Sequence, residues 1–350
     1  MTGGGPRNEG GWYAMEGVSL IEAKKTFLSP IYSRETNSFL DGKLFLGFDY
    51  RSQITKRPEF DPANPTQLKY ERDHLFMQLT PYVTYKPTEE IAIFVGYNLA
   101  EPELPGQQEW FAGISYRAHE LFAVKGGYIL PNFGVRHDDH TSFTRYGYGD
   151  FGHRGVGIAP MYAEPGGEVY VYPNEWLTIS GGAYSAQNRT DVSRQIDTGS
   201  IAFSGKVELL YPDYNSELIY QLGGSMLLYD GQTLIGGHAG FGLLDQGSIQ
   251  VEYVRREDDF ESAGGDPFNP SADVFLVKLN IELIEGLAFI GRYEEAKVED
   301  TETSHSFYKH YVAGLQIFPL PFIEIRPEYR WYDTPLVRIS QYTAQFHIFY

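Results

Sequence analysis

Hydrophobic and polar residues alternate with a period of two along most of the chain, in segments of roughly ten residues. In the first segment, 43–52, the apolar face carries Leu44, Leu46, Phe48 and Tyr50, and the other face carries Gly47, Asp49 and Arg51. In the second, one face is expected to carry Leu75, Met77, Leu79, Val83 and Tyr85. About sixteen such segments, of which the sixth, 167–172, is short, predict an all-β chain.

The spacers between these segments alternate in length. Short spacers follow every even segment, at 86–90, 118–120, 173–175, 212–215, 245–247, 284–286 and 319–321. Most odd segments are followed by longer spacers, at 54–73, 131–166, 187–199, 258–272 and 299–305, whereas 230–232 and 333–336 are short exceptions. Short turns on one rim and long loops on the other predict a transmembrane, antiparallel up-and-down β-barrel of about sixteen strands, with its short turns in the periplasm.

Composition agrees with this fold and excludes several classes of protein. The 350 residues include 27 tyrosines, 23 phenylalanines and 38 glycines. The chain has no run of about 18 apolar residues, so no membrane-spanning helix is predicted. The absence of cysteine excludes disulfides, thiolate zinc sites and covalently attached c-type haem. A net charge of −18 argues against a nucleic-acid partner, and it predicts that the lumen of the barrel prefers cations.

Residues 1–42 precede the first predicted strand, and 43–350 are expected to form the barrel. Ser19 and Glu22 match a helix capping box and Pro30 follows, so a short helix is predicted in a segment that lies in the periplasm or in the lumen. The start lacks a charged region followed by an apolar one, so the given sequence shows no secretion signal. We expect that a native signal was replaced by the initial Met, and that the protein resides in the outer membrane of a Gram-negative bacterium.

The last segment is an alternating aromatic strand that resembles the C-terminal strand of outer-membrane proteins. The resemblance implies recognition by the barrel-assembly machinery, and the residues that would carry it are Tyr342, Phe346, Ile348 and Tyr350. The usual last residue of such proteins is Phe or Trp, so Tyr350 departs mildly from the pattern. An ordinary terminal strand of a soluble β-sandwich is the alternative.

Charged residues on three late segments are expected to line the lumen. Charges that faced lipid near the bilayer midplane would each cost about 2–4 kcal/mol, so alternation with apolar residues directs them inward. The predicted pore-lining residues are Lys278, Glu282, Arg292, Glu294, Glu324, Arg326, Glu328 and Arg330. A charged pore wall and a set of salt bridges that fills a narrow lumen are both consistent with this pattern.

The longest spacer, 131–165, is predicted to fold into the lumen, because an exposed loop of this length is costly to order. The predicted constriction residues are Phe133, Arg136, His137, Asp138, Asp139, His140, Phe143 and Arg145. The carboxylates and imidazoles could instead bind a divalent metal, but consecutive residues of an extended chain point in opposite directions. Hydrolysis by Ser142 and His140 is a weaker alternative, because no nucleophile-elbow motif accompanies them. We therefore expect no metal, cofactor or catalytic site.

The stretches "LPNFGVRHDDHTSFTR" at 130–145 and "GGEVYVYPNEW" at 166–176 resemble porin-like outer-membrane proteins that accompany multihaem cytochromes. Asn132 stands where these proteins often have a second proline. The resemblance covers about 45 residues, and it implies a multihaem cytochrome as a partner. Because the chain has no CxxCH motif, any haem would belong to that partner.

The pattern as a whole predicts a porin-like outer-membrane channel, in contact with lipid, for passive diffusion of small or charged solutes. The first alternative is an insulating sheath around a cytochrome, and the second is an outer-membrane lipid hydrolase. A soluble β-rich binding protein such as a lectin is the third.

Overall fold

The computed structural model describes most of the chain between residues 38 and 349. The described residues are 38–40, 43–61, 64–100, 110–129, 131–135, 163–174, 176–185, 190–191, 194–195, 200–213, 218–243, 247–258, 260–261, 267–268, 271–284, 286–301, 304–320, 323–335 and 338–349. No helix long and apolar enough to cross a membrane occurs in these ranges.

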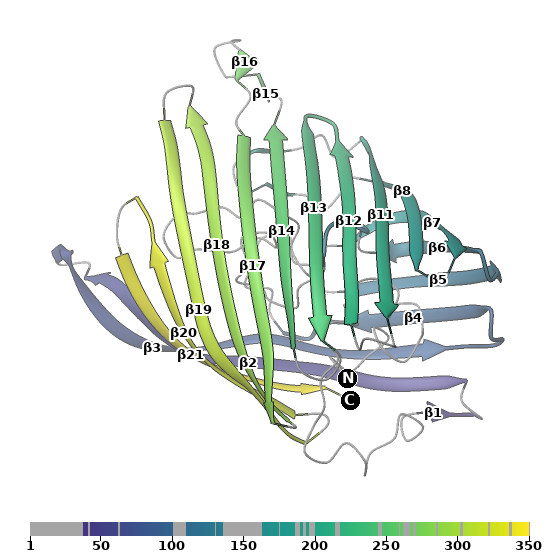
Figure 1. Cartoon of the computed structure of the whole chain (residues 1–350), viewed down its shortest axis with the longest axis horizontal. Coiled ribbons are helices and arrows are strands. Elements are labelled where there is room, and N and C mark those ends of the chain that lie inside the picture. Colours follow the sequence, from purple (N-terminus) through teal and green to yellow (C-terminus); the bar gives the residue numbers. More distant parts are fainter. Residues whose placement is uncertain are drawn as a thin grey trace.

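Sixteen antiparallel strands form one closed barrel, in which chain neighbours are also sheet neighbours (Figure 1). The strands are β2 (Leu44–Asp61), β3 (Asn64–Tyr85), β4 (Ile91–Tyr97), β5 (Trp110–His119), β6 (Phe122–Ile129), β7 (Glu164–Asn174), β8 (Leu177–Ser185), β11 (Ile201–Asp213), β12 (Leu218–Tyr229), β13 (Gln232–Leu243), β14 (Gly247–Asp258), β17 (Ser271–Ile284), β18 (Leu287–Thr301), β19 (Ser304–Leu320), β20 (Ile323–Asp333) and β21 (Arg338–Phe349). The predicted fold class and strand number are confirmed.

The barrel closes where the last strand, β21, pairs with the first, β2. The register runs from Asp49 opposite Phe349 to Lys56 opposite Tyr342. A closed sheet leaves no unpaired edge, and this is the condition for strands that lie in lipid. The end of the barrel that carries 86–90 and the other predicted short spacers is the turn end, and the opposite end is the loop end.

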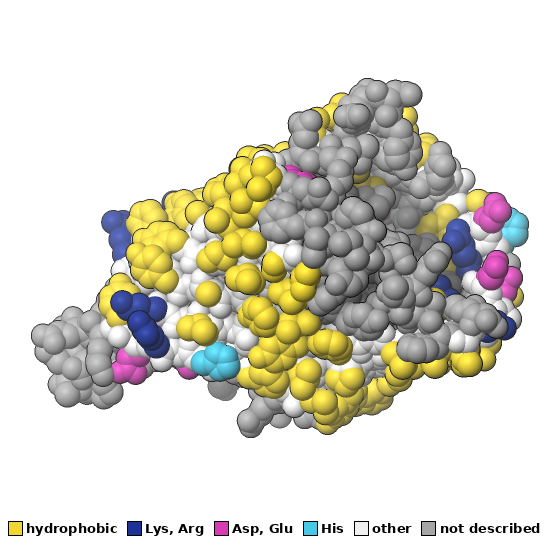
Figure 2. All heavy atoms as spheres, turned by 90° about the horizontal axis from the view of Figure 1, so that it is seen from below, with side chains coloured by type: hydrophobic (Ala, Val, Ile, Leu, Met, Phe, Trp, Pro, Cys, Tyr) yellow, Lys and Arg dark blue, Asp and Glu magenta, His cyan; other side chains and the backbone are white. Residues whose placement is uncertain are grey.

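The outer face of the barrel is apolar, as the alternation predicts. Figure 2 shows hydrophobic side chains over the middle of one face, with charged side chains gathered toward its two ends. On β12 the outward Leu222 is 60% exposed, whereas the inward Gln221 beside it is 5% exposed. A belt of this kind would be unstable in water but suits the hydrocarbon core of a bilayer.

Two predictions about the first hairpin are wrong. The spacer 54–73 was expected to be a loop, but β2 continues to Asp61 and β3 begins at Asn64, so most of it is paired strand. Leu75 was expected to face outward with Leu79. A β-bulge shifts the register so that Gln78 pairs with Arg51 and Phe76 with Ser52, which leaves Met77 between them. Leu75 then lies opposite the inward Gln53, because one extra residue exchanges the two faces of the strand.

Several smaller strands add to the predicted elements. β1 (Ser38–Phe39) pairs with the start of β2. Two spacers contain short hairpins: β9 (Thr190–Asp191) pairs with β10 (Arg194–Gln195), and β15 (Phe260–Glu261) pairs with β16 (Pro267–Phe268). The short sixth segment is confirmed as a strand and extends over Glu164–Asn174. The spacer 299–305, expected to be a loop, is mostly strand. The predicted helix near Ser19 lies outside the described residues.

Candidate pore wall and constriction

The four predicted charged residues of β20 face the lumen. Glu324, Arg326, Glu328 and Arg330 are each at most 9% exposed. The alternating residues Tyr329 and Trp331 point outward and are 41% and 40% exposed. The strand therefore keeps its charges away from the apolar belt.

Glu328 is the central residue of this charged row. Its carboxylate contacts Arg326 at 2.8 Å on one side and Arg330 at 2.5 Å on the other. Residues two apart on a strand share a face, so alternating signs allow every cation of the row to find an anion within the same strand. Two ion pairs of this row therefore share Glu328, whereas Glu324 contacts His347 and Gln316 on neighbouring strands.

A second network spans the seam between β2, β21 and β20. The imidazole of His347 lies between two carboxylates, with Nε2 at 3.0 Å from Asp49 and Nδ1 at 3.2 Å from Glu324. Arg51 pairs with Asp49 at 2.9 Å, and Gln316 donates to Glu324 at 2.6 Å. These polar contacts reinforce the backbone ladder where the barrel closes.

The predicted residues of β17 and β18 also lie on the lumen side. Lys278 stands opposite Arg292 in the register, and Glu282 stands opposite Ala288 beside a β-bulge. Arg292 pairs with Glu294 at 3.2 Å, and Glu294 contacts His310 of β19 at 3.0 Å. All eight residues predicted to line the pore therefore point inward.

Two further lumen clusters were not singled out from the sequence. On the wall formed by β6, β7 and β8, the Glu168 carboxylate pairs with Lys125 at 2.8 Å and accepts hydrogen bonds from the hydroxyls of Tyr170 and Tyr184. On β11 and β13, Glu208 lies 2.8 Å from Lys206 and 3.1 Å from His238. The signal that could have found them is the one used for β20, a charged residue on the polar face of an alternating strand.

Residues 131–135, which follow β6, run inside the barrel and are buried. The backbone N–H of Asn132 donates to Glu168 at 2.8 Å, and its side-chain amide donates to Ser180 at 3.0 Å. Further along, the backbone N–H of Val135 donates to Glu252 at 2.8 Å. Two buried carboxylates on different strands therefore hold the backbone of this segment.

Gly134 lies at the centre of this segment and is held at both backbone polar groups. Its N–H donates to Ser225 at 2.8 Å, and its carbonyl accepts from the Lys206 ammonium at 3.1 Å. Its φ of 60° is in the left-handed region, which glycine adopts without the penalty of a Cβ atom. We call residues 131–135, with their partners Glu168, Ser180, Lys206, Ser225 and Glu252, the lumen latch.

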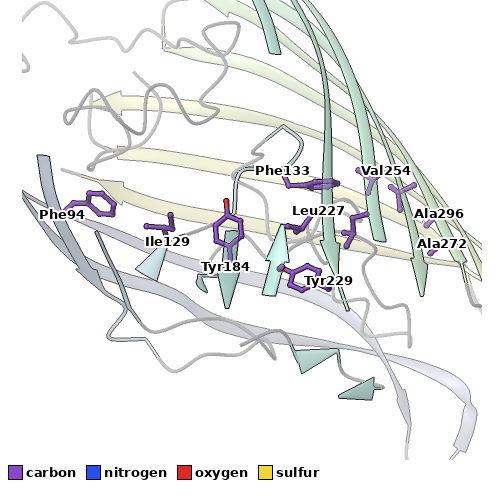
Figure 3. Packing of buried hydrophobic residues seen from close by; sticks show 12 residues of the cluster. Phe94, Ile129, Phe133, Tyr184, Leu227, Tyr229, Val254, Ala272 and Ala296 are labelled. Atoms are coloured by element: carbon purple, nitrogen blue, oxygen red, sulfur yellow. The ribbon is translucent and has the colours of Figure 1, made fainter. Parts of the chain in front are cut away.

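Phe133 is the one predicted constriction residue that the structure describes, and it is 2% exposed. It belongs to a buried apolar cluster that lies mainly toward the loop end of the lumen, together with Phe94, Ile129, Tyr184, Ala202, Leu227, Tyr229, Leu234, Val254, Ala272, Val274 and Ala296 (Figure 3). The ring of Phe133 packs over Gly236, where an added Cβ would lie 3.3 Å from it. This cluster surrounds Phe133 with apolar side chains from several strands of the barrel.

The other predicted constriction residues, Arg136, His137, Asp138, Asp139, His140, Phe143 and Arg145, lie outside the described residues, as does Ser142. Their placement in the lumen stays a prediction. Within the described ranges, no group of three or more histidine, cysteine, aspartate or glutamate side chains could hold a metal ion.

The residues predicted to form the assembly signal are partly described. Tyr342 and Phe346 point outward and are 57% and 36% exposed, and Ile348 shares their face of β21. Tyr350 lies outside the described residues. Their orientation fits contact with lipid, and their recognition by the assembly machinery stays a prediction.

Solved structures with the same architecture are outer-membrane proteins. The channel DcaP of Acinetobacter baumannii aligns with a TM-score of 0.60 and 9% identity over 88% of this chain and 97% of that one. OmpT of Vibrio cholerae aligns with a TM-score of 0.57 and 10% identity, over 88% and 97%. A porin structure aligns with a TM-score of 0.55 and 10% identity, over 87% and 100%. The fold is that of the outer-membrane porins.

No protein-family model matches the chain, and no curated protein sequence matches it. At 9–10% identity, the likeness to DcaP, OmpT and the porin extends to the fold alone. The cytochrome association implied by residues 130–145 and 166–176 is untested by these comparisons.

Proposed function

We propose that this chain is a porin-like channel of the Gram-negative outer membrane, through which small polar solutes diffuse passively. Three features support the proposal: the closed sixteen-stranded barrel, the apolar outer belt and the polar lumen wall. Barrels of sixteen to eighteen strands are wide enough to enclose an aqueous channel.

The lumen latch is the observation that carries the proposal. Carboxylates of β7 and β14 and hydroxyls of β8 and β12 hold residues 131–135 inside the barrel. A segment held in this way occupies part of the cross-section of the lumen, and it leaves the strands of the barrel wall in place. We therefore propose that the spacer 131–165 forms the constriction that sets the size of the solutes.

Single-channel recording of the purified protein in planar bilayers tests the proposal. We expect discrete, long-lived current steps that grow with salt concentration, as for a water-filled pore. A protein that inserts into the bilayer but gives no steps would refute the channel.

The proposal assigns no catalytic step to the chain. The described lumen clusters pair carboxylates with lysine, arginine, histidine and tyrosine groups, and these contacts satisfy charge without activating a nucleophile. Turnover of a lipid ester by the purified barrel would favour the hydrolase alternative.

A second candidate function rests on the sequence resemblance of residues 130–145 and 166–176 to porin-like partners of multihaem cytochromes. In that case the barrel would insulate an electron-carrying protein, and the same inward segment would contact it. Purification from native membranes decides between the two. Stoichiometric haem absorbance, with no current from the purified complex, would favour the sheath.

A further inference from the structure

The buried charges of the described lumen are nearly balanced, although the whole chain carries −18. The buried carboxylates are Asp49, Glu164, Glu168, Glu252, Glu294, Glu324 and Glu328. The buried lysines and arginines are Arg51, Lys125, Lys206, Arg292, Arg326 and Arg330. Seven acids stand against six cations in this buried set, and adding the partly buried Glu208, Glu282 and Lys278, which share the lumen face, gives nine acids against seven cations. These lumen residues therefore carry an excess of only two acids, a small part of the −18 of the whole chain from which a cation preference was predicted.

These charges are also paired locally. Acid and base stand two residues apart on the same strand in Asp49 with Arg51, Lys206 with Glu208, Arg292 with Glu294, and Arg326 with Glu328. The distances within these pairs run from 2.8 to 3.2 Å. Each pair is a short dipole along the wall, so its field falls off faster with distance than the field of a single charge.

Neutral amides fill much of the remaining polar wall. The buried ones are Gln53, Gln78, Gln221, Gln232, Gln250, Gln316, Gln341, Gln345, Asn98, Asn132 and Asn280. Several bond to one another or to the ion pairs, as Gln250 does to Gln221 at 3.2 Å and Asn280 to Gln316 at 3.3 Å. An amide offers both donors and an acceptor, so such a wall can exchange hydrogen bonds with a polar solute of either orientation.

A solute with net charge gains little from this wall. When it enters a narrow lumen it gives up part of its hydration, and wall charges that already have partners do not replace that loss. For a solute whose charges sum to zero, the free-energy cost of entering the lumen is smaller, because each of its ends can align with a wall dipole or form a hydrogen bond with an amide.

We infer that the channel favours polar solutes of zero net charge, zwitterions included, over solutes of the same size that carry a net charge. The inference rests on the proposed function, since it concerns which solutes pass the same lumen. It differs from the preference for cations that the total charge of the chain predicts.

Uptake by liposomes that contain the purified barrel tests this inference with three amino acids of nearly equal size. Glutamine is zwitterionic, glutamate carries one net negative charge and lysine one net positive charge at neutral pH. We expect glutamine to enter severalfold faster than either of the others. Lysine or glutamate entering as fast as glutamine, or faster, would overturn the inference.

An uncharged pentose separates this inference from the proposed function. If the pentose enters but a charged amino acid matches glutamine, the channel stands and only the inference fails. If no solute enters, the proposed function fails and the inference fails with it.

Substitutions in the β20 row supply the matched variants. Glu328→Gln removes the carboxylate between Arg326 and Arg330, and we expect it to raise glutamate entry severalfold relative to glutamine. The formal charges of Glu324, Arg326, Glu328 and Arg330 sum to zero in the wild type and to +1 in Glu328→Gln. The double variant Glu328→Gln with Arg330→Gln returns the charge of this row to zero and should restore the preference for glutamine. Tyr329→Phe, on the outer face of the same strand, should leave the rates unchanged. Equal rates in Glu328→Gln and the double variant would contradict a role for net charge.

Discussion

The backbone N–H of Val135 donates a hydrogen bond to Glu252 Oε1 at 2.8 Å, although the two residues are 117 positions apart. Val135 follows β6 and Glu252 lies on β14, with five strands of the barrel between them. The segment after β6 therefore contacts a strand of the barrel wall that is distant in sequence. Because an ionised carboxylate accepts a stronger hydrogen bond than a neutral group, this contact holds the segment firmly.

Loss of this contact should loosen the constriction. In Glu252→Ala the N–H of Val135 loses its acceptor, and an unsatisfied buried donor costs about 1–3 kcal/mol. We expect a larger and noisier single-channel conductance. The control is Glu257→Ala, five residues along the same strand, where the side chain is 53% exposed. Identical current traces from both variants would argue against a latch at Glu252.

Neighbouring glutamates on β18 should differ sharply in their effect on stability. Glu294 has a fully buried side chain that contacts Arg292 and His310, whereas the side chain of Glu295 is 38% exposed on the other face. Removing one partner of a buried pair typically costs about 3–5 kcal/mol, and an exposed pair contributes about 0–1 kcal/mol.

Unfolding by guanidinium in detergent measures this difference. Glu294→Ala should lower the free energy of unfolding by the larger amount, and Glu295→Ala should change it little. Similar losses in both variants would show that the cluster around Glu294 is not effectively removed from water.

An arginine on the outer face of the barrel should reduce folding into lipid far more than an arginine in the lumen. Leu222→Arg places a charge in the apolar belt of β12, at a cost of about 2–4 kcal/mol near the bilayer midplane. Gln221→Arg adds the same side chain on the lumen face. Refolding yields into lipid vesicles should fall for the first variant and stay near wild type for the second. Comparable yields would mean that the exposed face of β12 does not meet lipid.

The last strand offers a similar pair for assembly in cells. Phe346→Asp changes the outward aromatic row and Gln345→Asp changes the lumen face beside it. We expect the first substitution, and deletion of Tyr350, to abolish accumulation in the outer membrane because the predicted assembly signal is lost. The second should accumulate. Normal surface levels of Phe346→Asp and of the chain without Tyr350 would refute the signal.

The order of the strands, and the side of the barrel to which each side chain points, were predictable because both follow from the local alternation of polar and apolar residues. The period of two placed Glu324 and Arg330 inside and Trp331 outside, and the structure agrees. Sheet neighbours follow chain order in an up-and-down barrel, so no long-range topology had to be guessed.

Contacts between distant strands were not predictable in the same way. The bulge at Met77 depends on how β3 pairs with β2, and it reverses the face of Leu75 against the local alternation. The hydrogen bond between Val135 and Glu252 requires the chain to turn from the barrel wall into the lumen after β6. The alternation of polar and apolar residues gives no information about such a turn. Glu168 was missed because its four donors come from four different segments, although its place on the polar face of β7 could have drawn attention to it.

Deleting residues 132–148 and comparing single-channel conductance with the full chain tests the central claim most directly. The deletion removes most of the described latch and much of the predicted constriction, while every barrel strand keeps its sequence. If the segment narrows an open pore, the conductance should rise severalfold with the barrel still folded, as judged by strand-rich circular dichroism. A folded deletion variant whose conductance equals that of the full chain would contradict the account.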